Sequence, residues 1–172
     1  MSVRVDLPHS HIGGRALDTH VVAGTYTNRT GKLTELTVEG PDLHVKGSGP
    51  IELNDTGATD LTLHLESPAL DRLGQILGYP GYKGGAVVDT KVTGNGQTPK
   101  ATGRFDGSNV GMGGNNALDL DATFDLTVPK LTLADATIHA KTNATFLQVG
   151  GQQVNEASAD LTYSKSNLDF DA

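Results

Sequence analysis

Alternation of apolar and polar residues along much of the chain is the feature that most restricts how it can fold. The clearest example is residues 117–128, where every second residue from Leu118 onward is Leu, Ala, Phe or Val and the residues between them are Asp or Thr. A period of two is typical of a β-strand with one apolar and one polar face. This segment is about twice the usual strand length. The chain therefore predicts a long sheet with one dry face.

Related patterns predict an antiparallel meander, because short turns rich in Gly, Pro, Asn and Asp separate the alternating segments. The clearest turns are residues 39–42, 94–96 and 150–151. The predicted strands are residues 3–7, 19–27, 32–39, 42–47, 50–53, 58–66, 85–93, 98–106, 116–128, 130–140, 143–149, 153–164 and 166–171.

One short helix is predicted to interrupt the strands. Ser67 is a suitable N-cap, Pro68 suits the first helical position, and Gly78 can end the helix. An apolar stripe at helical spacing is formed by Leu70, Leu73, Ile76 and Leu77. A helix this short is marginal alone, so we expect it to dock over one end of the sheet; a lid or plug over an opening is the alternative.

A weak internal repeat relates two parts of the chain about 100 residues apart. Residues 32–34, 37–38 and 59–62 recur as residues 130–132, 137–138 and 159–162. In both copies the apolar phase switches just after the first leucine, Leu33 or Leu131, which predicts a β-bulge. Stacked repeats and chance similarity between amphipathic strands both remain open.

Composition favours an extended β architecture. Apolar residues make up 36% of the chain, below the usual 45–50% or so, and Gly is abundant while Trp is absent. A long sheet with one aliphatic face needs fewer large side chains than a compact core. The expected fold is all-β, an elongated, curled antiparallel sheet forming a groove with one short helix; a β-sandwich or closed barrel with a filled interior is the alternative.

Charge and hydropathy exclude several partners. The net charge is −7 and Lys and Arg do not cluster, which argues against nucleic acid. No apolar run approaches the roughly 20 residues of a transmembrane helix, and no signal-peptide pattern follows Met1. The first residues already read as a strand entered midway. We therefore expect residues 1–172 to be one β-groove fragment of a longer protein.

Catalytic and cofactor signatures are not found in the sequence. His9 and His11 would share a strand face, but no third metal ligand is identifiable and such residues are more often solvated. The other histidines are isolated on polar positions, and the carboxylates of Asp119, Asp121 and Asp125 are expected to keep the outer face wet. The Gly-rich stretches open no helix and carry no Lys, so they are not phosphate loops. We nominate no catalytic residue, metal or cofactor and expect no enzyme.

The order of features between residues 58 and 171 resembles the TamB/AsmA-like proteins of Gram-negative envelopes. An alternating strand ending near Leu65 leads to a short Leu-rich helix, and Gly84-Gly85 then opens a strand. Next come the stretch Thr93-Gly94-Asn95-Gly96-Gln97-Thr98-Pro99-Lys100-Ala101-Thr102-Gly103-Arg104-Phe105 and the paired strand of residues 117–128. This order is similar to the family's recurring sequence of strand, Gly, short turn with Pro, small-x-Gly and strand.

The resemblance implies a function that composition does not show. Proteins of this kind are anchored in the inner membrane and cross the periplasm as an open, curled sheet with an aliphatic interior. They are proposed to carry phospholipids to the outer membrane, and TamB works with an outer-membrane barrel partner, TamA. The resemblance thus implies a periplasmic location, acyl chains as ligand and a TamA-like partner reached through the parent protein.

The residues themselves suit that role, because the predicted dry wall carries few polar groups. Burying one methylene contributes about 0.8 kcal/mol, so a sixteen-carbon chain could gain roughly 10 kcal/mol before ordering costs. A uniform aliphatic wall favours sliding over specific capture. The alternative is a solid-core module serving as a spacer or protein-interaction domain. The predicted wall consists of Leu61, Leu63, Leu65, Val88, Val92, Leu118, Leu120, Phe124, Leu126, Leu161 and Tyr163.

Overall fold

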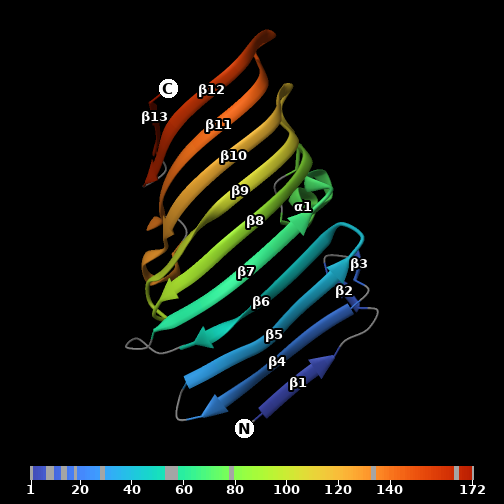
Figure 1. Ribbon diagram of the computed structural model, residues 1–172, viewed down its shortest axis with the longest axis vertical. Coiled ribbons are helices and arrows are strands. Elements are labelled where there is room, and N and C mark those ends of the chain that lie inside the picture. Colours follow the sequence, from blue (N-terminus) through green and yellow to red (C-terminus); the bar gives the residue numbers. More distant parts are fainter. Residues whose placement is uncertain are drawn as a thin grey trace.

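Eleven antiparallel strands form one curled, unclosed sheet in the computed structural model (Figure 1). The structure describes residues 2–6, 10–12, 15–17, 19–27, 30–52, 58–77, 80–132, 135–164 and 167–171. Chain order is kept across the sheet, as in a meander. The strands, in sheet order, are β1 (Ser2–Asp6), β4 (Thr19–Thr27), β5 (Thr30–Gly40), β6 (Leu43–Ile51), β7 (Thr59–Ser67), β8 (Tyr82–Gly94), β9 (Pro99–Met112), β10 (Asn115–Thr127), β11 (Thr137–Val149), β12 (Gln152–Ser164) and β13 (Asn167–Asp171).

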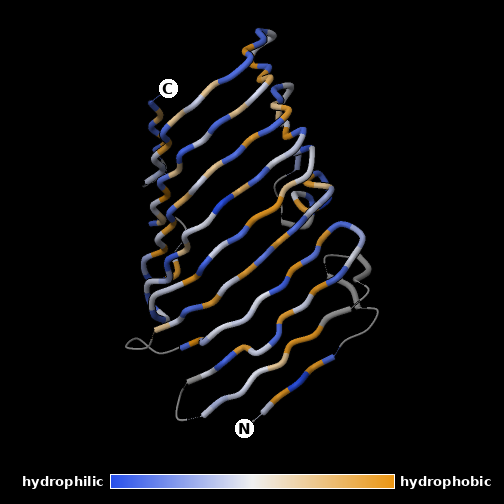
Figure 2. Tube along the Cα trace, in the orientation of Figure 1, coloured by the Kyte–Doolittle hydropathy of each residue, from blue (hydrophilic) through white to orange (hydrophobic). Residues whose placement is uncertain are grey.

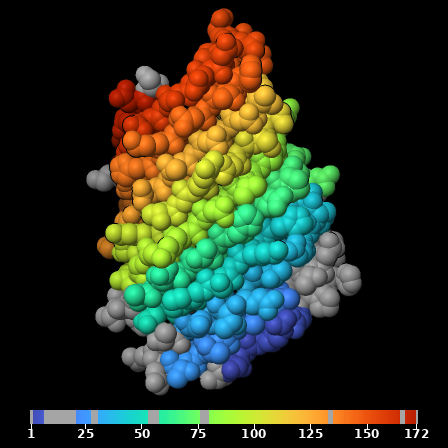
Figure 3. All heavy atoms as spheres, in the orientation of Figure 1, coloured from blue at the N-terminus to red at the C-terminus, as the bar shows by residue number. Residues whose placement is uncertain are grey.

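The predicted elongated, curled sheet is confirmed, and neither alternative fold is correct. In the described part of the chain β1 pairs only with β4 and β13 only with β12, so the sheet does not close. A two-stranded ribbon of β2 (Ser10–Ile12) and β3 (Arg15–Leu17), which the pattern did not predict, is the second sheet. On the face seen in Figure 3 the strands follow one another in colour order with no second described layer over them.

Alternation along the strands is what builds the sheet. Figure 2 shows hydrophobic and hydrophilic residues alternating along the central strands. The turns follow the predicted chemistry: Gly150 and Gly151 have φ of 57° and 82° between β11 and β12. These are the backbone angles that a tight hairpin turn requires, and only Gly adopts them without strain.

Two pairs of predicted strands are single strands in the structure. Residues 42–47 and 50–53 were predicted as separate strands, but β6 runs from Leu43 to Ile51, and Leu53 lies outside the described residues. Pro50 is tolerated in β6 because the ladder to β7 extends only to Ser48, so Pro50 pairs with β5 alone.

The prediction for residues 130–140 and 143–149 was also wrong at its start. Pro129–Leu131 form a 3₁₀ turn, η1, in which Lys130 and Leu131 have positive φ, and β11 begins only at Thr137. From there it runs unbroken to Val149. The fixed φ of Pro129 favours the turn over continued strand.

The helix, α1, spans Leu70–Leu77 and contacts β8 at one end of the sheet (Figure 1). Docking at one end was predicted, but the predicted start was wrong. The backbone N–H groups of Arg72 and Leu73 both donate to the carbonyl of Ala69, so the helix begins two residues after Pro68. Gly78 lies outside the described residues.

Ser67 is therefore not an N-cap. It is the last residue of β7, it is fully buried, and its Oγ donates to the carbonyl oxygen of Asp42, 2.9 Å away. The carboxylate of Asp42 in turn accepts from Arg72 of α1 at 2.9 Å. The turn between β5 and β6 thus holds both the end of β7 and the helix.

The predicted bulge after Leu33 is confirmed, because the β5–β6 register shifts between Leu33 and Leu36. Its counterpart after Leu131 falls in η1 rather than in a strand. The first copy of the repeated residues 32–34 lies in β5, whereas residues 130–132 occupy a turn. The two copies consequently differ in structure at this point.

Candidate functional site

Register brings the predicted wall residues onto one face. Because directly paired residues of an antiparallel sheet share a face, the ladder places Leu61 beside Val92, and Leu65 beside Val88. One row runs across the whole sheet from β1 to β13. Its members, linked pair by pair, are Val5, Val22, Leu36, Gly47, Leu63, Thr90, Gly103, Phe124, Ala140, Leu161 and Phe170.

A second row carries the remaining residues of the β10 and β12 wall. Leu126 pairs with Ile138, which pairs with Tyr163. Leu120, four residues along β10 from Phe124 and on the same face, pairs with Gly107 and Ala144. Ten of the eleven predicted residues thus belong to one apolar face, and Leu118 remains to be placed.

Leu118 lies where the sheet backbone departs from regular strand geometry. It sits between the rungs formed by Ala117 and Asp119, opposite Asn109 of β9 and Phe146 of β11, whose φ angles are 50° and 48°. Left-handed residues inside a strand change the alternation of side chains. Beyond Asn109, the side chain of Val110 reaches the space above Gly107. The irregular backbone at Asn109 thus changes which face the following residues of β9 occupy, and Val110 lies on the inner face together with Gly107.

The apolar face is not sealed by the described part of the protein. The eleven predicted wall residues are all partly or largely exposed, Leu118 to 43%. The hydrophobic residues that are buried, among those described, are small apart from one valine: Val21, Ala86, Ala117, Ala136 and Ala144. A filled interior would instead bury the Leu and Phe side chains. The wall is an open surface.

Two glycines of β9 on this face lie close to phenylalanine rings, Gly103 to one from the neighbouring strand β10 and Gly107 to one from β9 itself. A Cβ on Gly103 would lie 2.9 Å from Cζ of Phe124, and one on Gly107 would lie 2.7 Å from Cε1 of Phe105. Phe124 thus covers Gly103 across the ladder, as aromatic side chains cover glycines in other sheets. Over β9 and β10 the floor of the groove is consequently filled by the protein's own rings.

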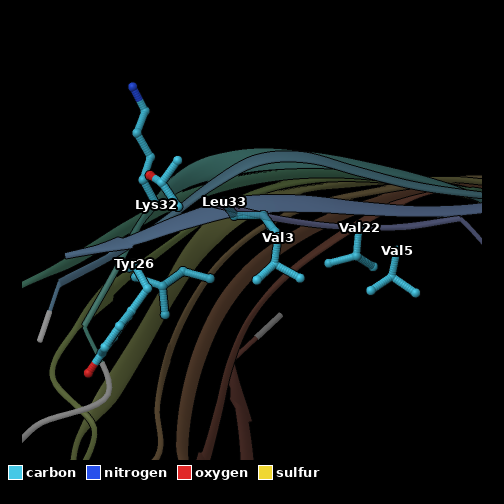
Figure 4. Close-up of a pocket in the computed structure, with 10 residues that line it drawn as sticks. Val3, Val5, Val22, Tyr26, Lys32 and Leu33 are labelled. Atoms are coloured by element: carbon cyan, nitrogen blue, oxygen red, sulfur yellow. The ribbon is translucent and has the colours of Figure 1, made fainter. Parts of the chain in front are cut away.

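An apolar hollow lies near the other end of the sheet and was not singled out from the sequence. It has a volume of 260 Å³ and extends over β1, β4, β5 and β6. Figure 4 shows Val3, Val5, Val22 and Tyr26 on the side toward which the sheet curls, while Lys32 points the other way. The sequence signal for this hollow was the alternation of apolar and polar residues in residues 3–7 and 19–27, but that pattern indicated only that these segments are strands. The hollow is lined by Val3, Val5, Val22, Gly24, Thr25, Tyr26, Gly31, Lys32, Leu33 and Ile51.

The opposite face is charged and wet. Arg104 contacts the carboxylates of Asp106 at 2.6 Å and Asp121 at 3.2 Å, which are cross-strand partners. Hydrogen bonds from Arg104 and then Asp121 lower the pKa of Asp106, and the same two carboxylates raise the pKa of Arg104. The guanidinium thus neutralises two like charges that would otherwise repel across the ladder.

Two histidines described as isolated from the sequence have carboxylate partners. Nδ1 of His64 lies 2.6 Å from Asp89, and Nδ1 of His44 contacts Glu39. Each pair joins neighbouring strands on the polar face. Proximity across the ladder created these pairs, which no local sequence signal indicates.

The His9 and His11 hypothesis cannot be placed, because His9 and the side chain of His11 lie outside the described residues. In the part of the chain that is described, no three His, Cys, Asp or Glu side chains converge on a possible metal position. None of the helices within the described ranges has the length and apolarity needed to cross a membrane.

Comparisons with known proteins leave the groove to be interpreted from its geometry. No protein-family model, no curated protein and no solved structure matches this chain.

Proposed function

We propose that this chain is a non-catalytic segment of a periplasm-spanning protein that carries phospholipid acyl chains along a hydrophobic β-groove. Its parent is anchored in the inner membrane and carries lipid between the inner and outer membranes. The resemblance of residues 58–171 to TamB/AsmA-like proteins supports the location. The same resemblance supports a partner, an outer-membrane barrel of the TamA kind.

One observation carries the proposal: a row of mostly aliphatic residues runs from Val5 in β1 to Phe170 in β13 on one face, and the described chain leaves it uncovered. Exposed apolar surface is unfavourable at about 25 cal/mol per Å². A hydrocarbon chain lying along the row would remove that surface from water on both partners.

The chemistry of the wall favours an acyl chain over a polar ligand. A pocket for a specific polar ligand places a few hydrogen-bonding groups among apolar ones. The charged groups of β8–β11 instead alternate onto the opposite face, as the pairing of Asp121 with Asp106 and of Asp89 with Arg104 shows. A ligand on the wall therefore meets methyl groups and rings, and can slide with low barriers.

Lipid extraction of the purified protein, followed by mass spectrometry, tests the proposal. We expect phospholipid to be recovered from the wild-type protein and in smaller amount from Leu120→Glu and Phe124→Glu, which place a carboxylate on the wall. Thr123→Glu is the matched control, because Thr123 is exposed on the opposite face of β10 beside Arg104 and Lys141.

A β-type circular dichroism spectrum must persist in each variant for the comparison to count. Should Leu120→Glu and Phe124→Glu both prevent folding, and no lipid ever accompany the wild-type protein, the module is a structural spacer or an interaction domain instead.

A further inference from the structure

The apolar face is not uniform: its hollow over β1 and β4–β6 differs from the wall over β9 and β10. The difference lies in what occupies the space above the glycines. Over Gly103 and Gly107 the rings of Phe124 and Phe105 fill that space. At these two glycines the central wall therefore presents rings rather than a depression.

Side chains approach the glycines of the hollow less closely than they approach Gly103 and Gly107. The three atoms nearest to a Cβ on Gly24 would all be backbone atoms, the nearest being the carbonyl oxygen of Lys32 at 2.9 Å. On Gly31 it would meet the carbonyl oxygen of Ile51 at 3.1 Å and Cδ2 of Tyr26 at 3.7 Å. The hollow, with its volume of 260 Å³, is a depression in the same apolar face.

Side chains around the hollow are apolar and accessible. Val3, Val5, Val22 and Tyr26 are between 42% and 52% exposed, and all four lie on the inner side in Figure 4. The ammonium group of Lys32 is directed to the other side of the sheet (Figure 4), so the hollow presents no side-chain cation to a headgroup. An uncharged hydrocarbon is the ligand chemistry that such a lining accepts.

The size of the hollow indicates part of a chain rather than a whole lipid. It crosses four neighbouring strands, and three inter-strand steps span about 14 Å. Continuity with the row through Leu36 and Leu63 lets the remainder of the tail extend along the groove.

We infer that the hollow over β1 and β4–β6 is a holding site for one acyl chain, at which a lipid in the groove rests longer than on the central wall. The inference builds on the proposed function, since it assumes that acyl chains enter the groove. It replaces a uniform conduit with one that has a preferred position.

Site-specific photocrosslinking tests the holding site. A benzoylphenylalanine is placed at Val22 in the hollow, at Ala140 in the same row over β11, or at Lys32 on the opposite face. The protein is mixed with vesicles of phosphatidylethanolamine that carries a radiolabelled palmitoyl chain. We expect several-fold more lipid adduct at Val22 than at Ala140, and background labelling at Lys32.

A filling variant makes the test independent of the probe at Val22. With the probe at Val5, Val22→Phe should lower the adduct several-fold, while the same substitution leaves the adduct at Ala140 unchanged. Circular dichroism of the Val22→Phe variant checks that it folds. Should Val22→Phe prevent folding, the ratio of adducts at Val22 and Ala140 in the otherwise wild-type chain decides alone.

The two proposals fail in different ways. Equal adducts at Val22 and Ala140 would overturn the holding site and leave lipid transport by the groove intact. Background labelling at both positions would overturn the holding site and the proposed function together.

Discussion

Phe124 lies over Gly103, its direct partner across the β9–β10 ladder, at 2.9 Å from the position that a Cβ on the glycine would take. The ring thereby covers backbone that would otherwise be exposed on the inner face. The absence of a side chain at Gly103 is what allows this close approach.

Gly103→Ala should therefore destabilise the sheet by about 1–3 kcal/mol, the usual cost of overpacking. The new methyl group would collide with the Phe124 ring and with the carbonyl oxygen of Asp89. Chemical denaturation measures the change. Gly111→Ala is the control, because its nearest neighbour is Asn115 O at 3.1 Å and its φ is ordinary, so its stability should stay within about 1 kcal/mol of wild type. Equal effects at both glycines would contradict the packing of Phe124 on Gly103.

Ser67→Ala should cost about 1 kcal/mol, since it removes a buried hydrogen bond to the carbonyl oxygen of Asp42. The matched control is Ser158→Ala, whose hydroxyl bonds Asn143 in an exposed position and whose loss should change stability by less than about 0.5 kcal/mol. Thermal and urea unfolding of the two variants, followed by far-UV circular dichroism, measure the difference. A Ser67 variant as stable as the wild type would show that the bond does not hold β7 to the β5–β6 turn.

Asp106 should link stability to acidic pH. Its pKa is lowered in the folded protein, chiefly by the hydrogen bond from Arg104. A carboxyl whose folded pKa is depressed stabilises the fold above its unfolded pKa, near 3.9, and this contribution is lost as pH falls through the folded pKa. Arg104→Gln should raise the pKa of Asp106 toward its ordinary value and flatten the loss of stability below about pH 4.

NMR titration of the Asp106 carboxyl carbon measures this shift directly. Lys91→Gln is a suitable control, because Lys91 forms an ion pair with Asp60 elsewhere on the same face. An Asp106 pKa that is the same in Arg104→Gln and in wild type would remove Arg104 as the cause.

Acyl ligands should raise the melting temperature by mass action. A ligand that binds only the folded state stabilises it by about 2.7 kcal/mol at one hundred times its Kd. We expect lysophosphatidylethanolamine to raise the Tm of the wild type and of Thr123→Glu, but much less that of Val22→Glu, which places a carboxylate in the hollow, measured by scanning calorimetry. A full shift that persists in Val22→Glu would place the ligand away from the hollow.

The period-two pattern was enough to predict most strands and, where the strands are regular, the face on which a side chain lies. Segments such as β10 and β12 were predicted to within about a residue at each end. Turn residues placed the hairpins, and the phase change after Leu33 predicted a bulge that the β5–β6 register confirms. These features depend on neighbours along the chain, whose effects are visible in sequence.

Contacts between distant residues produced the differences. Pro50 was predicted to begin a separate strand, but β6 continues through it. The β6–β7 ladder ends at Ser48, so no hydrogen bond to β7 requires an N–H at position 50. Ser67 has the residue type of a helix cap, yet the carbonyl of Asp42, twenty-five positions away, captures its hydroxyl. Only the folded sheet brings these partners together.

The same division holds for the site. Alternation alone determined that Leu63, Phe124 and Leu161 would share an apolar face, because side chains alternate strictly along a strand. Tertiary structure decided that the sheet curls without closing, that Phe124 covers Gly103, and that an apolar hollow lies over β1 and β4–β6. Register and curvature arise from pairing between strands, and a pattern of period two is compatible with a sandwich, a barrel or an open groove alike.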